Sequence, residues 1–194
     1  QVWLNVASSL TFPSAFASGD RVVNLSGEAY FEVSKDPDRP FKVSSGKHLI
    51  EVLGTHFNVS AYLDESAIKT TLVEGSVKVS SEGQSKLIQP GQQSVFRKND
   101  GELKVRNVNI ESETAWKNGI FSFENNNIRY ILRQISRWYD IEVIYEEAIP
   151  DDEYIGEISR KTSLQEVLQI LELNNLTFRL NGKTLYVSSS KTDR

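Results

Sequence analysis

The amino-acid sequence predicts two domains, an all-β domain over residues 1–112 followed by an α+β domain over residues 113–194. Three observations predict this fold class. Short β-type runs separated by turn residues fill the chain up to about residue 110. Amphipathic helical patterns occur only after that point. In that second part the order strand, helix, strand occurs twice.

The first domain is predicted to be antiparallel and to form either a twisted sandwich or a solenoid-like stack. Its runs are rich in Val, Ile, Thr, Phe and Tyr with imperfect alternation, which is typical of half-buried strands. The segment Lys35–Pro40 (KDPDRP) cannot continue a central strand and is predicted to be a loop. Glycines then punctuate the later runs every 8 to 10 residues, as expected for successive hairpins or coils: Gly75, Gly83, Gly91 and Gly101.

The second domain begins with a strand, IFSFE, and an asparagine cluster that can cap a helix. The helix itself is predicted over Ile128–Asp140. Its apolar residues recur at i, i+3, i+4, i+7, i+10 and i+11 and form one continuous stripe that faces a core: Ile128, Ile131, Leu132, Ile135, Trp138 and Tyr139.

A second helix repeats this pattern. Four of its apolar residues follow their counterparts in the first helix by 36 positions: Leu164, Val167, Leu168 and Leu171. Its start offers a capping box, either Thr162 with Gln165 or Ser163 with Glu166. The segment Phe121–Leu180 is therefore predicted to be two β-α-β units, and Asn181-Gly182 is predicted to form a type I′ hairpin into a last strand.

The composition is that of a globular protein that needs neither a metal ion nor a disulfide to fold. Apolar residues make up 39% and charged residues 25%, and there is no cysteine, which excludes disulfides, iron–sulfur clusters and thiol nucleophiles. The net charge of −4 argues against a nucleic-acid-binding surface spread over the whole chain, because phosphate contacts need an excess of Lys and Arg. We expect no cofactor and no nucleic-acid partner. The absence of methionine, even at position 1, indicates a processed or excised piece of a longer protein.

The string EVLGTHFNV (Glu51–Val59) raises the question of catalysis, because it holds one of only two histidines. His56 and His48 lie on neighbouring runs that could pair across the sheet. No third ligand accompanies them, so we expect a histidine tolerated on a strand rather than a metal ligand or a base. Gly54 is expected to separate two strands, and Phe57 is expected to pack in the sheet.

Other signatures of catalysis are missing from the sequence. There is no GxSxG elbow, P-loop or GxGxxG motif. The acidic run Asp151–Glu153 lacks the spacing of a calcium loop and is predicted to be a solvated turn. An enzyme such as a glycosidase would need a cleft with paired carboxylates, and nothing in the sequence indicates one. We therefore expect a protein without enzymatic activity.

Three arginines are candidates for a binding surface rather than for an active site. Arg129, Arg133 and Arg137 are spaced by four and line one flank of the first helix, off its apolar stripe. One interpretation is a solvated face paired with the acidic residues of the segment 142–147. The other is a patch that docks an acidic partner surface. Trp138 and Tyr139 fall on the apolar stripe and are expected to pack in the core rather than to hold a ligand.

Six segments, taken in order along the chain, carry a resemblance to a known family. They resemble the periplasmic part of FecR-family anti-sigma factors, and they span nearly the whole chain: Val2–Pro13, Leu25–Val43, Val52–Tyr62, Thr70–Val79, Ile88–Phe96 and Ala115–Val143. The second domain resembles the C-terminal domain that commonly follows the FecR domain. That domain is similar to the short N-terminal domain of secretins and TonB-dependent receptors, which is built from two β-α-β halves.

The resemblance implies a mechanism of signal transduction across two membranes of a Gram-negative bacterium. Relatives join a periplasmic module like this one, through one inner-membrane helix, to a cytoplasmic domain that holds an extracytoplasmic-function sigma factor. The signalling domain of a TonB-dependent outer-membrane transporter engages the module, and proteolysis then releases the sigma factor. Such a module needs a docking surface rather than an active site. We expect an exposed strand edge of the second domain, together with Arg129, Arg133 and Arg137.

An alternative is a secreted β-rich structural or carbohydrate-binding protein. A carbohydrate binder would need aromatic side chains exposed on a concave sheet. Tyr30, Phe57 and Tyr62 are the candidates for such a surface.

Overall fold

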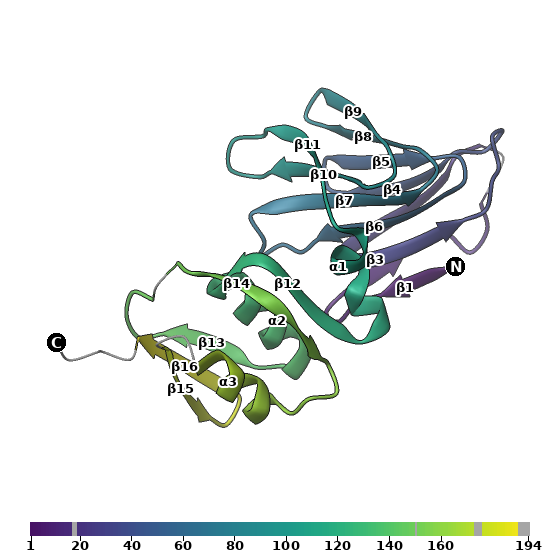
Figure 1. Cartoon of the computed structure of the whole chain (residues 1–194). Coiled ribbons are helices and arrows are strands. Elements are labelled where there is room, and N and C mark those ends of the chain that lie inside the picture. The colour runs from purple at the N-terminus through teal and green to yellow at the C-terminus, as the bar shows by residue number, and fades with distance from the viewer. Residues whose placement is uncertain (17–18, 150, 173–175, 190–194) are drawn as a thin grey trace. The chain divides into compact units, whose positions relative to one another are not determined.

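The computed structural model describes residues 1–16, 19–149, 151–172 and 176–189. It divides the chain into two units, Gln1–Lys117 and Asn118–Arg194 (Figure 1). The boundary expected between residues 112 and 113 lies inside a short helix, α1 (Ile110–Thr114), near the end of the first unit.

The N-terminal unit is built from β-strands, which are followed by α1 and the 3₁₀ turn η1 (Ala115–Asn118). The strands are β1 (Val2–Leu4), β2 (Ser9–Thr11), β3 (Arg21–Val33), β4 (Phe41–Ser45), β5 (His48–Val52), β6 (Thr55–Ala61), β7 (Ala67–Glu74), β8 (Val77–Ser81), β9 (Gln84–Ile88), β10 (Gln92–Arg97) and β11 (Leu103–Asn107).

These strands form one sheet in the order β11-β10-β7-β6-β3-β4-β5-β8-β9, and β1 and β2 also pair with β3. The predicted loop Lys35–Pro40 is confirmed, and it returns the chain to the start of β3, so that β3 and β4 pair in parallel. The domain is therefore rich in β-strands as predicted, but it is not wholly antiparallel and it ends in a short helix. A parallel pair needs such a crossover, which a tight hairpin cannot supply.

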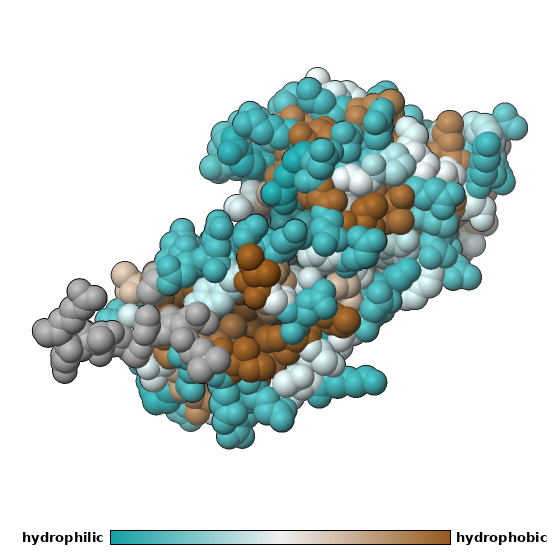
Figure 2. All heavy atoms as spheres, viewed as in Figure 1, coloured by the Kyte–Doolittle hydropathy of each residue, from teal (hydrophilic) through white to brown (hydrophobic). Residues whose placement is uncertain are grey.

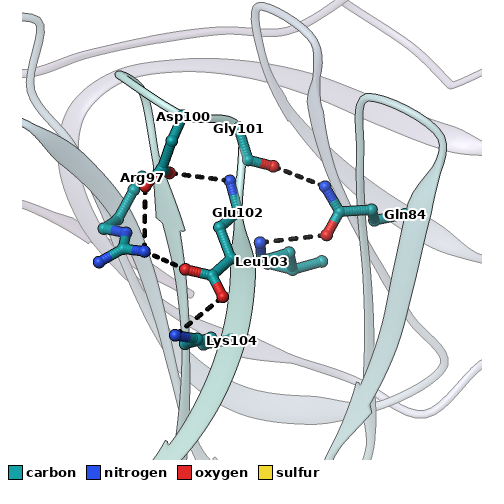
Figure 3. Close-up of polar contacts among 7 residues, drawn as sticks. All are labelled: Gln84, Arg97, Asp100, Gly101, Glu102, Leu103 and Lys104. Atoms are coloured by element: carbon teal, nitrogen blue, oxygen red, sulfur yellow. Dashed lines mark hydrogen bonds and ion pairs between the residues drawn. The ribbon is translucent and has the colours of Figure 1, made fainter.

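The sheet curls into a near-barrel, in place of the expected sandwich or solenoid-like stack, and its two end strands meet at Gln84 (Figure 3). The side-chain amide of Gln84 donates to the carbonyl oxygen of Gly101 over 2.5 Å and accepts from the backbone N–H of Leu103 over 3.2 Å. Beside it, Arg97 binds both Asp100 and Glu102. A side chain thus supplies, at this point, the hydrogen bonds that a neighbouring strand would make.

Strand β3 is the longest strand of the unit and changes neighbours at its midpoint. Its first half pairs with β2 and β4, and its second half pairs with β1 and β6. Gly27 lies between these halves with φ of 90°, and an added Cβ would lie 2.3 Å from the Oγ of Ser8. Only glycine fits both this backbone conformation and this close approach.

A buried carboxylate and a tryptophan tie the end of the unit to its sheet. Glu28 is 6% exposed and accepts from the side-chain amides of Asn5 (2.7 Å) and Asn58 (2.9 Å). The indole N–H of Trp116, in η1, donates to the Oδ1 of Asn58 over 3.1 Å. The Nζ of Lys117 lies 3.9 Å from the ring centre of Tyr30. The chain segment that leaves this unit is therefore held by specific polar and cation–π contacts.

In its described residues, the C-terminal unit has two helices and two small sheets. Its elements are β12 (Ile120–Asn127), α2 (Ile128–Tyr139), β13 (Glu142–Tyr145), β14 (Glu153–Ser159), α3 (Leu164–Glu172), β15 (Leu176–Asn181) and β16 (Thr184–Ser189). The order strand, helix, strand occurs twice, as predicted. The strands of each β-α-β unit lie in different sheets, however, because β12 pairs with β14, and β13 pairs through β16 with β15.

Both helices begin with the expected caps. Asn127 accepts from the backbone N–H of Tyr130 over 3.0 Å and caps α2. At α3 the capping box is the second of the two expected pairs, since Ser163 and Glu166 exchange side-chain to backbone hydrogen bonds. Apart from Trp138, the apolar stripes of both helices pack into one core with the inner faces of the two sheets.

The last hairpin is present, but its turn is shifted by one residue from the prediction. Asn181 pairs with Thr184, so Gly182 and Lys183 form the loop. Gly182 has φ of 59°, whereas Lys183 is not among the described residues with positive φ. A type I′ turn requires positive φ at both loop residues, so the predicted turn type is wrong.

Candidate docking surface of the C-terminal unit

The three predicted arginines lie along α2, and all three are half-buried. The guanidinium carbon of Arg129 lies 4.5 Å from the ring centre of Tyr145 in β13, and that of Arg133 lies 6.0 Å from the ring centre of Tyr130. Burial raises the pKa of Tyr145, and the charges of Arg129 and Arg133 lower it. Arg129 and Arg133 are therefore cations laid over tyrosine rings, which restricts their side chains.

Two carboxylates of the segment 142–147 bind other groups. The carboxylate of Glu146 pairs with Arg179 over 2.6 Å. The carboxylate of Glu147 accepts from the backbone N–H of Ser189 over 3.1 Å. Tyr145, which sequence reasoning overlooked, is the residue that the structure brings to the arginine row.

Arg160 is a second residue that the sequence pattern did not single out. It is 6% exposed, and its guanidinium carbon lies 4.7 Å from the ring centre of Phe121 and 4.9 Å from that of Trp138. The indole N–H of Trp138 donates to the backbone carbonyl of Arg160 over 3.1 Å. Trp138 is 38% exposed, so the expectation of a core residue is wrong for it. It covers a buried arginine from the outside, whereas Tyr139 packs against the core as expected.

Strand edges are the other feature of this unit that can bind a protein. Within the described residues, β14 pairs only with β12, and β13 and β15 each pair only with β16. The side chain of Ile155 in β14 is 77% exposed. Figure 2 shows hydrophobic residues reaching the surface of this unit between hydrophilic ones. The sequence predicts these strands, but which of their edges stay open follows only from the sheet topology.

The two histidines do not come together. His48 is 1% exposed on β5, and His56 is partly exposed on β6, where its Nδ1 lies 3.2 Å from the Oε2 of Glu74. Strands β5 and β6 are not neighbours in the sheet, so the expectation that they could pair is wrong. Within the described residues no three His, Asp or Glu side chains are grouped as metal ligands would be. Gly54 does separate β5 from β6, as expected.

The aromatic residues proposed for carbohydrate binding are all buried. Tyr30 is 5% exposed, Tyr62 is 4% exposed and Phe57 is 0% exposed. Sugar rings stack on exposed aromatic faces, and none of these three side chains offers one. The carbohydrate-binding alternative therefore loses the residues on which it depended.

Within the described ranges, no helix combines the length and the apolar character that a membrane crossing requires.

Known protein families match both parts of the chain. The family model described as FecR protein matches residues 1–78, and the model described as FecR, C-terminal matches residues 120–187. No curated protein is significantly similar to the chain.

Solved structures agree with these family matches. Two crystal structures of a putative anti-sigma factor from Parabacteroides distasonis ATCC 8503, at 1.65 and 2.50 Å resolution, are each similar to this chain with a TM-score of 0.91 and 26% sequence identity. Each similarity covers 98% of this chain and 90% of the solved chain. The family so matched is regulatory rather than catalytic. The chain belongs to the FecR family of anti-sigma factors and consists of a FecR domain followed by a FecR C-terminal domain.

Proposed function

We propose that this chain is the periplasmic sensor and signal-transducing module of a single-pass inner-membrane anti-sigma factor of a Gram-negative bacterium. Its C-terminal unit engages the signalling domain of a TonB-dependent outer-membrane transporter. This engagement controls the release of an extracytoplasmic-function sigma factor. The sigma factor and the membrane are reached through parts of the protein outside these 194 residues.

One observation carries the proposal. The FecR C-terminal domain presents a half-buried arginine row and open strand edges on a single small unit. Both features suit a protein partner, because an open edge offers main-chain hydrogen bonds and a cationic row attracts an acidic surface. The arginine row is also partly ordered before binding by its contacts with tyrosine rings, which reduces the entropy lost on docking.

Reversing the charge of the arginine row tests the proposal. We expect Arg129→Glu, Arg133→Glu and Arg137→Glu, combined in the whole chain, to weaken binding of the transporter's signalling domain by about tenfold or more at low salt. The dependence of the affinity on salt should fall in the same variant, since long-range attraction between opposite charges is screened by salt. Titration calorimetry at two salt concentrations measures both effects.

The matched control places the same change of charge in the N-terminal unit. Lys78, Lys86 and Lys104 are exposed on its strands, and their combined replacement by Glu should alter the affinity by less than about threefold. Thermal unfolding of both variants checks that the fold is kept. Unchanged affinity and salt dependence in the arginine variant would contradict a role for the row. A wild-type chain that does not bind the signalling domain would contradict the proposed partner itself.

A further inference from the structure

We propose that the outer edge of β14 is the edge that receives a strand of the transporter's signalling domain, and that this strand carries a basic, apolar, basic pattern on one face. The inference rests on the proposed function and names the edge and the chemistry of the partner. Four observations lead to it: the direction of the main-chain groups of β14, the side chains on its outer face, their uncompensated charge, and the protection of the opposite edge.

The direction of the main-chain groups follows from the β12–β14 ladder. The backbone N–H of Arg160 donates to the carbonyl oxygen of Gly119 over 2.8 Å, which makes these two residues a hydrogen-bonded pair. Because antiparallel pairs alternate, Ile158 and Gly156 then also point their main-chain groups at β12. The groups of Ser159, Glu157 and Ile155 point to the outer edge.

An independent hydrogen bond agrees with this alternation. The carbonyl oxygen of Ser159 accepts from the backbone N–H of Thr162 over 3.0 Å, which places it on the side away from β12. Further along the strand, the N–H and C=O groups of Glu157 and Ile155 make no hydrogen bond to a described residue outside the strand pair. They form the row of unpaired donors and acceptors that an added strand requires.

The side chains of β14 divide cleanly between two faces. Tyr154 and Ile158 pack against the core of the unit. Glu153, Ile155 and Glu157 lie on the outer face, and all three are exposed. An incoming strand would set its own side chains opposite this sequence of acidic, apolar and acidic residues.

The negative charge on the outer face of β14 determines which kind of strand can pair with this edge. Among the described residues neither Glu153 nor Glu157 has an ion-pair partner, and the carboxylate of Glu157 accepts only from the Oγ of Ser122 over 3.3 Å. Like charges placed opposite one another destabilise a strand pair, whereas opposite charges stabilise it. A second copy of β14 would bring carboxylates against carboxylates. The edge therefore suits a strand with Lys or Arg on either side of an apolar residue.

The opposite edge of the same small sheet is protected. Strand β12 contains a bulge in which Glu124 and Asn125 stand opposite Ile155, and Asn125 has φ of 54°. The backbone N–H of Glu124 is taken up by the Oδ1 of Asn126 over 2.9 Å. A bulge with a satisfied N–H disfavours strand addition.

On the other sheet, the open edges belong to β13, which has 4 residues, and β15, which has 6, against 7 in β14.

The test measures binding of the whole chain to the transporter's signalling domain by titration calorimetry. In Glu157→Pro the ring replaces an N–H that points to the outer edge, so the β12–β14 ladder keeps its hydrogen bonds. We expect this variant to bind about tenfold more weakly, because the added strand loses hydrogen bonds and meets the ring. Glu153→Lys with Glu157→Lys should weaken binding by about tenfold through charge alone.

The matched control is Asp151→Lys with Asp152→Lys, which makes the same change of charge just before the strand; we expect it to weaken binding by less than about threefold. If Glu157→Pro does not fold, the affinity of the variant with Glu153→Lys and Glu157→Lys tests the proposal. If both β14 variants bind the signalling domain as tightly as the wild-type chain does, the assignment of the β14 edge is wrong, whereas the proposed function still holds. No binding by the wild-type chain would overturn both. Self-association of the chain that Glu157→Pro abolishes would overturn the assigned occupant.

Discussion

Phe57→Ala is expected to lower the free energy of unfolding of the N-terminal unit by about 3–5 kcal/mol. The side chain is 0% exposed, and its ring stacks on that of Phe31 with a centroid distance of 5.0 Å. Phe57 lies on β6, directly opposite Phe31 of β3, at the centre of the sheet. Truncation removes the ring and leaves a cavity that the surrounding strands cannot collapse to fill. Differential scanning calorimetry of the whole chain measures the loss.

The neighbouring residue supplies the control. His56→Gln changes a partly exposed side chain on the same strand, where its main contact is with exposed Glu74, and it should alter stability by less than about 0.5 kcal/mol. Binding of the transporter's signalling domain should also be unchanged. A well-folded His56→Gln variant that no longer binds would show that the histidine has a functional role. A loss below about 1 kcal/mol for Phe57→Ala would show that the core repacks around the missing ring.

Acidification is expected to destabilise the N-terminal unit through His48. Burial lowers the pKa of His48 from its ordinary value of 6.5 to about 4, and neither ring nitrogen has a hydrogen-bond partner among the described residues. Between these two pH values the unfolded chain binds a proton that the folded chain does not. The contribution of neutral His48 to the free energy of unfolding, about 3 kcal/mol, is therefore fully present above about pH 6.5 and is lost as the pH falls toward 4.

Replacement of the histidine isolates this effect from the titration of carboxylates. His48→Leu places an apolar side chain of similar size beside the ring of Phe96. Its melting temperature should therefore fall less than that of the wild type between pH 7 and about pH 4.5. The His56→Gln variant should keep the wild-type profile. Parallel profiles for the wild type and His48→Leu would show that His48 is charged or solvated in the folded unit.

The candidate docking surface shows which functional features can be predicted from the sequence and which cannot. Helical spacing alone placed Arg129, Arg133 and Arg137 on one flank of a helix, because residues four apart share a face. It did not predict that Tyr145 would lie beneath that flank, since a contact between a helix and a strand depends on the pairing of β13 with β16. The same limit applies to Arg160, whose aromatic neighbours come from β12 and from α2.

The amino-acid pattern alone was enough to predict a β-rich part followed by an α+β part, the order of the C-terminal elements, the caps of both helices and the family. These features depend on periodicity and on hydrogen bonds between residues close in the chain. The folded structure was needed to establish that β3 and β4 are parallel, that the strands of each β-α-β unit separate into two sheets, and that β14 keeps an open edge among the described residues. Those outcomes depend on pairings between distant segments, whose register and neighbours a local pattern does not specify.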